Sequence, residues 1–211
     1  MVFRRRDRLP ILSRISGLVY PKGGWARAAS YVWHRLRRLP DAPHRIARGM
    51  FAGILVSFTP LFGFHFLLAV IVGYAIRANI LAALLATFLG NPITFPFIAG
   101  AALATGNWIF GFGDPLSFPQ IMAAFSRAGA ELWHNLTSPF TGEPAHWSSL
   151  ARFYDRVFLP YLVGGVLPGT LAGLAGYYVT IPLVTAYQNR RRKKLRERFL
   201  RIREQLAERG L

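Results

Sequence analysis

The 211-residue chain is long enough for one domain or one compact helical bundle, and the absence of cysteine excludes disulfides, thiol catalysis and cysteine-ligated metals. Hydrophobic residues make up 53% of the chain, and charged residues make up 17%, below the roughly 25% of soluble domains. A net charge of +17 is typical of nucleic-acid binding in a soluble protein, but here the basic residues gather at the chain ends and indicate an anionic lipid surface instead.

The first predicted element is a basic segment covering residues 1–42. Its apolar residues recur at spacings of four and three, which places them on one helical face: Trp25, Ala29, Val32, Leu36 and Leu39. A basic amphipathic helix with tryptophan is typical of an element that lies among lipid headgroups. We therefore predict a cytoplasmic segment that binds anionic lipid; the alternative is a helix packed on the rest of the protein.

Three segments contain no Asp, Glu, Lys or Arg: residues 49–76, 78–113 and 157–189. A bilayer core is about 30 Å thick, and a helix crosses it with about 20 apolar residues. Residues 43–189 are therefore expected to form a membrane domain. The predicted fold class is an all-α, polytopic membrane protein with kinked or re-entrant helices and flanking amphipathic helices.

The first apolar stretch, 49–76, is interrupted near its middle by Pro60 and Gly63, which break or kink a helix. Each half then has about 12 residues, or about 18 Å of helix, which is too short to cross. We predict a re-entrant hairpin, with a kinked helix as the alternative. Arg77 follows it on the cytoplasmic side.

The second stretch, 78–113, has a similar break at Gly90-Asn91-Pro92-Ile93-Thr94-Phe95-Pro96. Non-helical backbone at membrane depth is tolerated only when it is buried in protein or lines a cavity. Transporters place substrate sites at such breaks, because the ends of half-helices expose backbone dipoles. We expect this stretch to cross outward as a broken helix.

The loop 114–156 holds three basic and four acidic residues, whereas residues 1–48 hold 12 basic residues and residues 190–211 hold 10. The positive-inside rule then predicts that both termini are cytoplasmic and that the loop lies outside. The third stretch, 157–189, returns to the cytoplasm and continues into a basic helical tail, 190–211. Glycines four residues apart let helices pack closely in lipid, which indicates helix packing, and dimerisation, through Gly165, Gly169 and Gly173.

His65 is the most readily titratable side chain within the apolar stretches, so it is a candidate to relay protons or to bind an anionic group. The alternative is a histidine bonded to a backbone carbonyl. The other polar candidates for a ligand or transport site are Thr59, Asn79, Asn91 and Thr94, of which Asn91 also suits a helix cap. All nine acids lie outside the apolar stretches. We therefore expect no catalytic residues, no enzyme activity, no cofactor and no metal.

Five short elements together resemble the bacterial domain-of-unknown-function family 2062 (DUF2062). They are residues 20–25, 43–49, 58–65, 77–79 and 90–96. The most specific part is the Gly-Asn-Pro-x-Thr-x-Pro element at its distance from the Thr-Pro-x-x-Gly element. The resemblance covers roughly residues 20–188 and implies a prokaryotic membrane protein, without implying an activity or any functional residue.

These observations predict a multi-pass protein of the bacterial inner membrane that acts in transport or lipid handling at a polar site between broken helices. The alternative is a non-catalytic scaffold or anchor that binds anionic lipid or a partner protein through the basic chain ends. The expected partners are the bilayer with its anionic lipids and a second copy of the chain, and no nucleic acid.

Overall fold

The computed structural model describes residues 27, 30–31, 34–35, 39, 41–113 and 116–208. The chain divides into two compact units, Met1–Pro40 and Asp41–Leu211. Most of the predicted amphipathic segment 1–42 lies outside the described residues. The predicted all-α class is confirmed, because the regular elements of the described residues are all helices: α3 (Pro43–Ser57), α4 (His65–Ala75), α5 (Ile80–Ala86), η1 (Thr87–Leu89), α6 (Phe95–Phe110), α7 (Phe118–Thr141), α8 (Ser148–Phe153), η2 (Tyr154–Phe158) and α9 (Leu159–Glu208).

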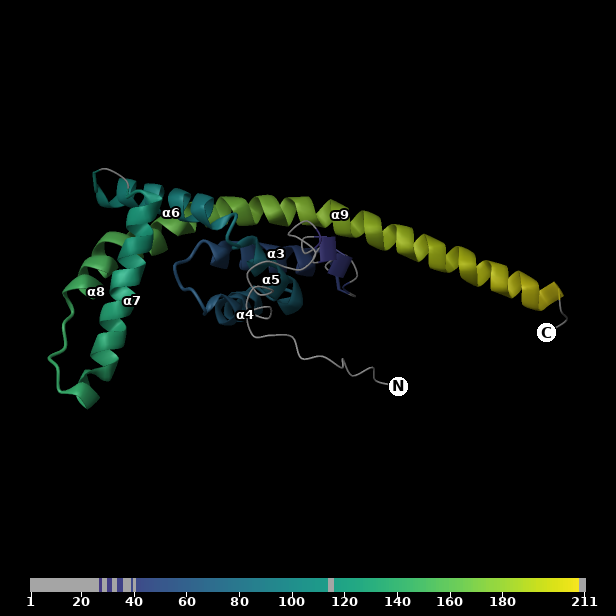
Figure 1. The fold of residues 1–211 in the computed structure, drawn as a ribbon. Helices are drawn as coiled ribbons and strands as arrows, with labels where there is room; N and C mark the ends of the chain where they lie inside the picture. The colour runs from purple at the N-terminus through teal and green to yellow at the C-terminus, as the bar shows by residue number, and fades with distance from the viewer. Residues whose placement is uncertain are drawn as a thin grey trace. The chain divides into compact units, whose positions relative to one another are not determined.

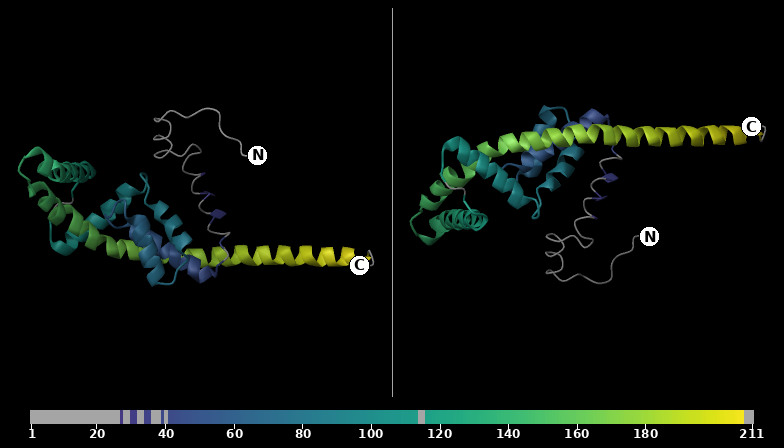
Figure 2. Two further views of the ribbon diagram at one scale, coloured as in Figure 1. Left: turned by 90° about the horizontal axis from the view of Figure 1, so that it is seen from below. Right: turned by 90° about the horizontal axis from the view of Figure 1, so that it is seen from above.

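Helix α9 is the element against which α3 and α6 pack, and these two helices follow one another along it (Figures 1 and 2). Glycines allow the close approach. A methyl group added to Gly106 of α6 would overlap the backbone of Pro160, and one added to Gly164 of α9 would overlap the backbone of Ala102 and Gly106. Backbones this close are typical of helix packing in membranes.

Helices α3, α4 and α5 form a second group, in which α3 packs against both others. Ala52 of α3, Ala69 of α4 and Ala83 of α5 are fully buried together. Gly49 and Gly53 of α3 lie against the backbone of α5, and a side chain at either position would overlap it. The chain therefore folds back after α3 and again after α4, so α3 and α4 form a helical hairpin.

Helix α9 runs for 50 residues and continues through Pro168 and Pro182, where proline alone predicts an interruption of the helix. A proline inside a helix removes one hydrogen bond and crowds the preceding turn. Membrane-type helices tolerate this change where neighbouring helices support the turn. Here Phe58 and Leu55 of α3 pack against Gly169, directly beside Pro168.

Helix α7 begins with a capping box, in which Ser117 and Gln120 satisfy backbone groups at the helix start. It continues through Pro139 to Thr141, and Gly142 closes it with a left-handed backbone (φ 73°). Helices α7 and α8 then pack against each other as a hairpin.

Among the described residues, one continuous helical segment, Ser148–Arg201, is long and apolar enough to cross a membrane. Three further apolar helical segments have 10–17 residues: His65–Ala75, Ile80–Leu89 and Phe95–Phe110. The described part of the chain thus has one helix of spanning length together with three short apolar ones.

Candidate functional site

The two Pro/Gly breaks lie against each other. Ser57, at the end of α3, donates from Oγ to the carbonyl oxygen of Thr87 at 3.3 Å, and a side chain at Gly90 would touch Ser57. The ring of Phe62, in the first break, meets the ring of Phe95, just after the second break, edge-on with centroids 5.3 Å apart. We call this meeting point, residues 58–65 and 90–95, the broken-helix site.

His65 begins α4, and its Nε2 lies 3.0 Å from the carbonyl oxygen of Thr59, to which it donates. The hydroxyl of Thr59 in turn donates to the carbonyl oxygen of Val56 at 2.8 Å. Both side chains therefore satisfy backbone carbonyls that the break leaves without helical partners. This contact matches the alternative of a backbone-bonded histidine, and a role for His65 in binding or proton transfer stays a prediction.

Asn91 and Thr94 hold the second break together. Oδ1 of Asn91 accepts from the N–H groups of Ile93 (2.9 Å) and Thr94 (3.2 Å), while its Nδ2 donates to the carbonyl oxygen of Leu89 at 3.3 Å. The hydroxyl of Thr94 also contacts the carbonyl oxygen of Leu89. The polar atoms of these two candidates thus form the turn that leads into α6.

Tyr161 of α9 also contacts the broken-helix site, although we did not predict it from the sequence. Its side chain is completely buried, its ring lies 6.3 Å from that of Phe62, and its hydroxyl has no hydrogen-bond partner in the structure. An unpartnered buried hydroxyl is uncommon, so this group is available to a bound molecule or to water.

Asn79 does not belong to the broken-helix site, because it lies at the opposite end of α5. Its Oδ1 caps α5 by accepting from Ala82 N–H at 2.8 Å, and its Nδ2 donates to Asp41 at 3.1 Å. Asp41 also pairs with Arg45 at 3.2 Å, and its carbonyl oxygen accepts from Gln188 at 2.8 Å. We call this group of four residues the basal polar cluster.

The three candidate packing glycines of α9 face α3 of the same chain. A side chain at Gly165 would meet the backbone of Phe58, one at Gly169 would meet the ring of Phe58, and one at Gly173 would meet the ring of Phe51. This face of α9 is therefore filled within one chain, and dimerisation through it would require α3 to move away.

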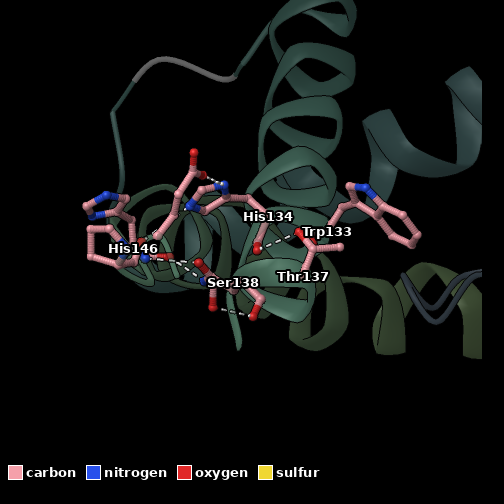
Figure 3. Close-up of polar contacts among 8 residues, drawn as sticks. Trp133, His134, Thr137, Ser138 and His146 are labelled. Atoms are coloured by element: carbon pink, nitrogen blue, oxygen red, sulfur yellow. Dashed lines mark hydrogen bonds and ion pairs between the residues drawn. The ribbon is translucent and has the colours of Figure 1, made fainter. Parts of the chain in front are cut away.

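Hydrogen bonds and an ion pair hold the turn between α7 and α8 against α7 (Figure 3). Asn135 accepts from the N–H of His146 at 2.9 Å and also donates to the carbonyl oxygen of His146. His134 pairs with Glu143 at 3.3 Å, and its ring stacks on that of His146 with centroids 6.0 Å apart. Every described partner in this network is a neighbouring group of the same hairpin, so the network has a structural role.

Glu131 anchors the start of α8 to α7. Its carboxylate accepts from the N–H groups of Ser149 (3.1 Å) and Leu150 and from the hydroxyl of Ser148. Desolvation raises the pKa of Glu131, but these hydrogen bonds and the nearby His146 outweigh it, so the pKa lies below its ordinary value of 4.5. The carboxylate thus serves as a charged cap for α8.

A cleft of about 450 Å³ lies between the end of α6, the start of α7, α8 and η2. Its lining includes Arg127, Arg152 and Arg156, together with the polar residues Asn107, Gln120 and Ser149. One signal in the sequence could have identified this cleft: the three arginines are the basic residues of loop 114–156. The cluster was not recognised because Arg127 lies 25 or more residues before Arg152 and Arg156 in the sequence.

The chain belongs to the family described as "Uncharacterized protein conserved in bacteria (DUF2062)", whose model matches residues 26–193. The resemblance that we noted in the sequence is thereby confirmed. No curated protein and no solved structure matches the chain.

Proposed function

We propose that this protein is a multi-pass protein of the bacterial inner membrane that handles lipid at the broken-helix site and has no catalytic activity. The observation that carries the proposal is the set of exposed large apolar side chains on α4, α6 and α9. It includes Tyr74 (82% exposed), Phe97 (76%) and Tyr178 (68%). Exposed apolar surface on this scale is typical of contact with lipid or with another apolar surface.

The apolar helices also differ from the core helices of soluble proteins. Only 39% of the most apolar window of Ser148–Arg201 is buried inside the structure, whereas a soluble core helix is mostly buried. Helix α4 carries apolar residues all round, yet only Ala69 and Gly73 of it are buried. Lipid is the environment that best suits such helices.

In the proposed topology, α9 crosses the membrane, and α3 and α6 together line its inner side as one discontinuous crossing. The 15 residues of α3 and the 16 residues of α6 are each too short to cross alone. Placed one after the other they reach about 46 Å at about 1.5 Å per residue, which is sufficient. The hairpin α3–α4 is then re-entrant.

The charges support the same orientation. Asp41 of the basal polar cluster bonds Gln188, so the cluster lies beside the part of α9 where the basic run Arg190-Arg191-Arg192-Lys193-Lys194 begins. Basic residues near membrane helix ends favour the cytoplasmic side. We therefore place the basal polar cluster at the cytoplasmic face, and α7 and α8 at the opposite face.

Lipid handling is preferred over transport of a small polar solute because the broken-helix site offers few unsatisfied polar atoms. Its exposed side chains are mainly apolar, including Phe64 (60% exposed) and Ile93 (55%). The bonded state of Asn91 and Thr94 also favours the second candidate function, a non-catalytic scaffold that binds anionic lipid or a partner protein.

Labelling of single cysteines with a membrane-impermeant thiol reagent tests the proposal, since the natural chain has no cysteine and serves as the blank. We expect Ala75→Cys and Leu195→Cys to react only in inverted vesicles, and Ser126→Cys only in intact cells. All three positions are exposed. Labelling of Ser126→Cys from the cytoplasmic side would overturn the topology.

Two further positions separate the candidate functions. If Leu61→Cys and Ile93→Cys are protected from the water-soluble reagent but react with a lipid-soluble maleimide, the broken-helix site faces lipid and lipid handling is supported. If they react with the water-soluble reagent, the site is an aqueous cavity and polar transport is favoured. Protection from both reagents would indicate packed protein and favour the scaffold.

A further inference from the structure

We propose that Arg127, Arg152 and Arg156 form a binding site for a phosphate group, carried by a lipid headgroup or by a soluble phosphate compound. This second site is separate from the broken-helix site, and the inference goes beyond the proposed function. The three arginines come from three elements, α7, α8 and η2, and line one cleft. The family description assigns no site to the chain.

The charge of the cleft is not balanced from within. None of the described residues that line it is acidic, and neither of the ion pairs found in the described part of the chain involves these arginines. Two carboxylates of the same hairpin are engaged elsewhere, since Glu131 caps α8 and Glu143 pairs with His134. The lining of the cleft therefore carries an excess of positive charge that an external anion can balance.

The arginines are partly held in place before any ligand binds. The guanidinium carbon of Arg156 lies 4.6 Å from the ring centroid of Phe112, a cation–π contact that leaves the guanidinium edges available for hydrogen bonds. Nε of Arg127 donates to the carbonyl oxygen of Ala123 at 3.3 Å. Because a fixed guanidinium loses little freedom on binding, each contact adds more to affinity.

A phosphate group fits the cleft better than a carboxylate does. A phosphate monoester carries about two negative charges at neutral pH and has three oxygens that accept hydrogen bonds, so it can engage several guanidinium groups at once. Asn107, Gln120 and Ser149 add neutral polar groups to the lining. At about 450 Å³, the cleft is large enough for a group bigger than a bare phosphate ion.

The remaining lining is apolar and leads toward the broken-helix site. Phe153 lines the cleft and contacts the ring of Phe125, with centroids 4.7 Å apart. Phe125 in turn contacts Phe62 of the broken-helix site at 5.4 Å. These ring contacts connect the lining of the cleft to the broken-helix site through the partly buried side chains of Phe153 and Phe125.

Calorimetric titration of the purified full-length protein in detergent tests the proposal with three probes: inorganic phosphate, glycerol 3-phosphate and phosphatidic acid. We expect saturable binding of at least one probe, weakened about tenfold in Arg152→Gln, because the variant loses a charge-assisted hydrogen bond; tenfold corresponds to about 1.4 kcal/mol. Arg152→Lys keeps the charge but loses the guanidinium fork, so we expect it to bind weakly as well.

The matched control is Arg198→Gln, which removes the same charge from an exposed position of α9 outside the cleft. We expect it to bind as the natural protein does. Binding of phosphatidic acid alone would identify a lipid headgroup site, whereas binding of inorganic phosphate or glycerol 3-phosphate would identify a soluble phosphate compound. If Arg152→Gln does not fold, as judged by circular dichroism, Arg127→Gln takes its place.

Two outcomes would overturn the proposal. One is the absence of saturable binding of all three probes by the natural protein. The other is an equal loss of binding in Arg152→Gln and Arg198→Gln, which would show that binding depends on the net charge of the protein and not on the cleft. Neither outcome depends on the membrane topology, so failure here is distinguishable from failure of the proposed function.

Discussion

Arg77 ends α4 with its backbone in the left-handed region, at a φ of 52°. Its N–H donates to the carbonyl oxygen of Tyr74 at 3.0 Å, and the N–H of Ala78 donates to that of Gly73 at 2.8 Å. This is the hydrogen-bond pattern of a Schellman motif, in which glycine is the usual left-handed residue. Because arginine disfavours this backbone conformation, we infer that Arg77 is present for its charge.

We expect Arg77→Gly to be more stable than Arg77→Ala by about 1 kcal/mol, because glycine adopts the left-handed conformation without a steric penalty. Both variants lose the charge, so their difference isolates the backbone contribution. Thermal unfolding in detergent, followed by circular dichroism, measures it. Equal melting temperatures for the two variants would show that the backbone at this position is not strained.

For the polar candidates, the sequence predicts where each residue lies but not which group its side chain binds. The pattern located His65, Asn91 and Thr94 at the breaks, where the structure has them. Residue type does not tell whether a polar side chain faces a ligand or its own loop. Here the side chain of Asn91 accepts hydrogen bonds from the backbone of its own turn. Tyr161 escaped notice because an isolated tyrosine in an apolar helix has no distinguishing pattern.

At the scale of helices, the pairing of α6 with α9 depends on glycines that permit backbone contact. We expect Gly106→Ala to destabilise the protein by about 1–3 kcal/mol, because the added methyl group overlaps the backbone of Pro160, which cannot rotate away. Gly100→Ala, on the same helix, is the control. Its methyl group would meet nothing within 4 Å.

For Gly100→Ala we expect unchanged or higher stability, since alanine favours a helix over glycine by about 1 kcal/mol. The melting temperatures of the two variants in the same detergent give the comparison. A Gly106→Ala protein as stable as the Gly100→Ala protein would mean that α6 and α9 are farther apart than the structure has them.

The α7–α8 hairpin should respond to acid through Glu131. The pKa of this carboxyl is lowered on folding, so its stabilising effect is present above the ordinary pKa and is lost as the pH falls through the folded value. We expect Glu131→Gln to be less stable at neutral pH and to lose less stability on acidification than the natural protein.

Unfolding curves recorded from neutral to acidic pH measure this dependence on Glu131. Glu197→Gln removes an exposed carboxylate from the basic tail and serves as the control, with the pH dependence of the natural protein. If Glu131→Gln and Glu197→Gln show the same dependence, the cap on α8 does not contribute to acid sensitivity.

At the scale of the whole chain, hydropathy and charge were sufficient to predict the helical class, the two breaks and the hydrophobic character of 157–189. They did not predict that α9 continues through Pro168 and Pro182, because a local rule for proline takes no account of the neighbouring helix. The arginine cleft could not be predicted from the sequence either, since it forms only when α7, α8 and η2 come together.

The order of the helices along the chain has a consequence for biogenesis. The hydroxyl of Tyr177 contacts His44 at 3.1 Å across 133 residues, and Gln188 reaches Asp41 across 147 residues. Translation delivers α3 and α6 before α9, yet both complete their packing only against α9. The early helices must therefore remain in the membrane with open glycine-lined faces, exposed to chaperones and proteases, until α9 has been synthesised.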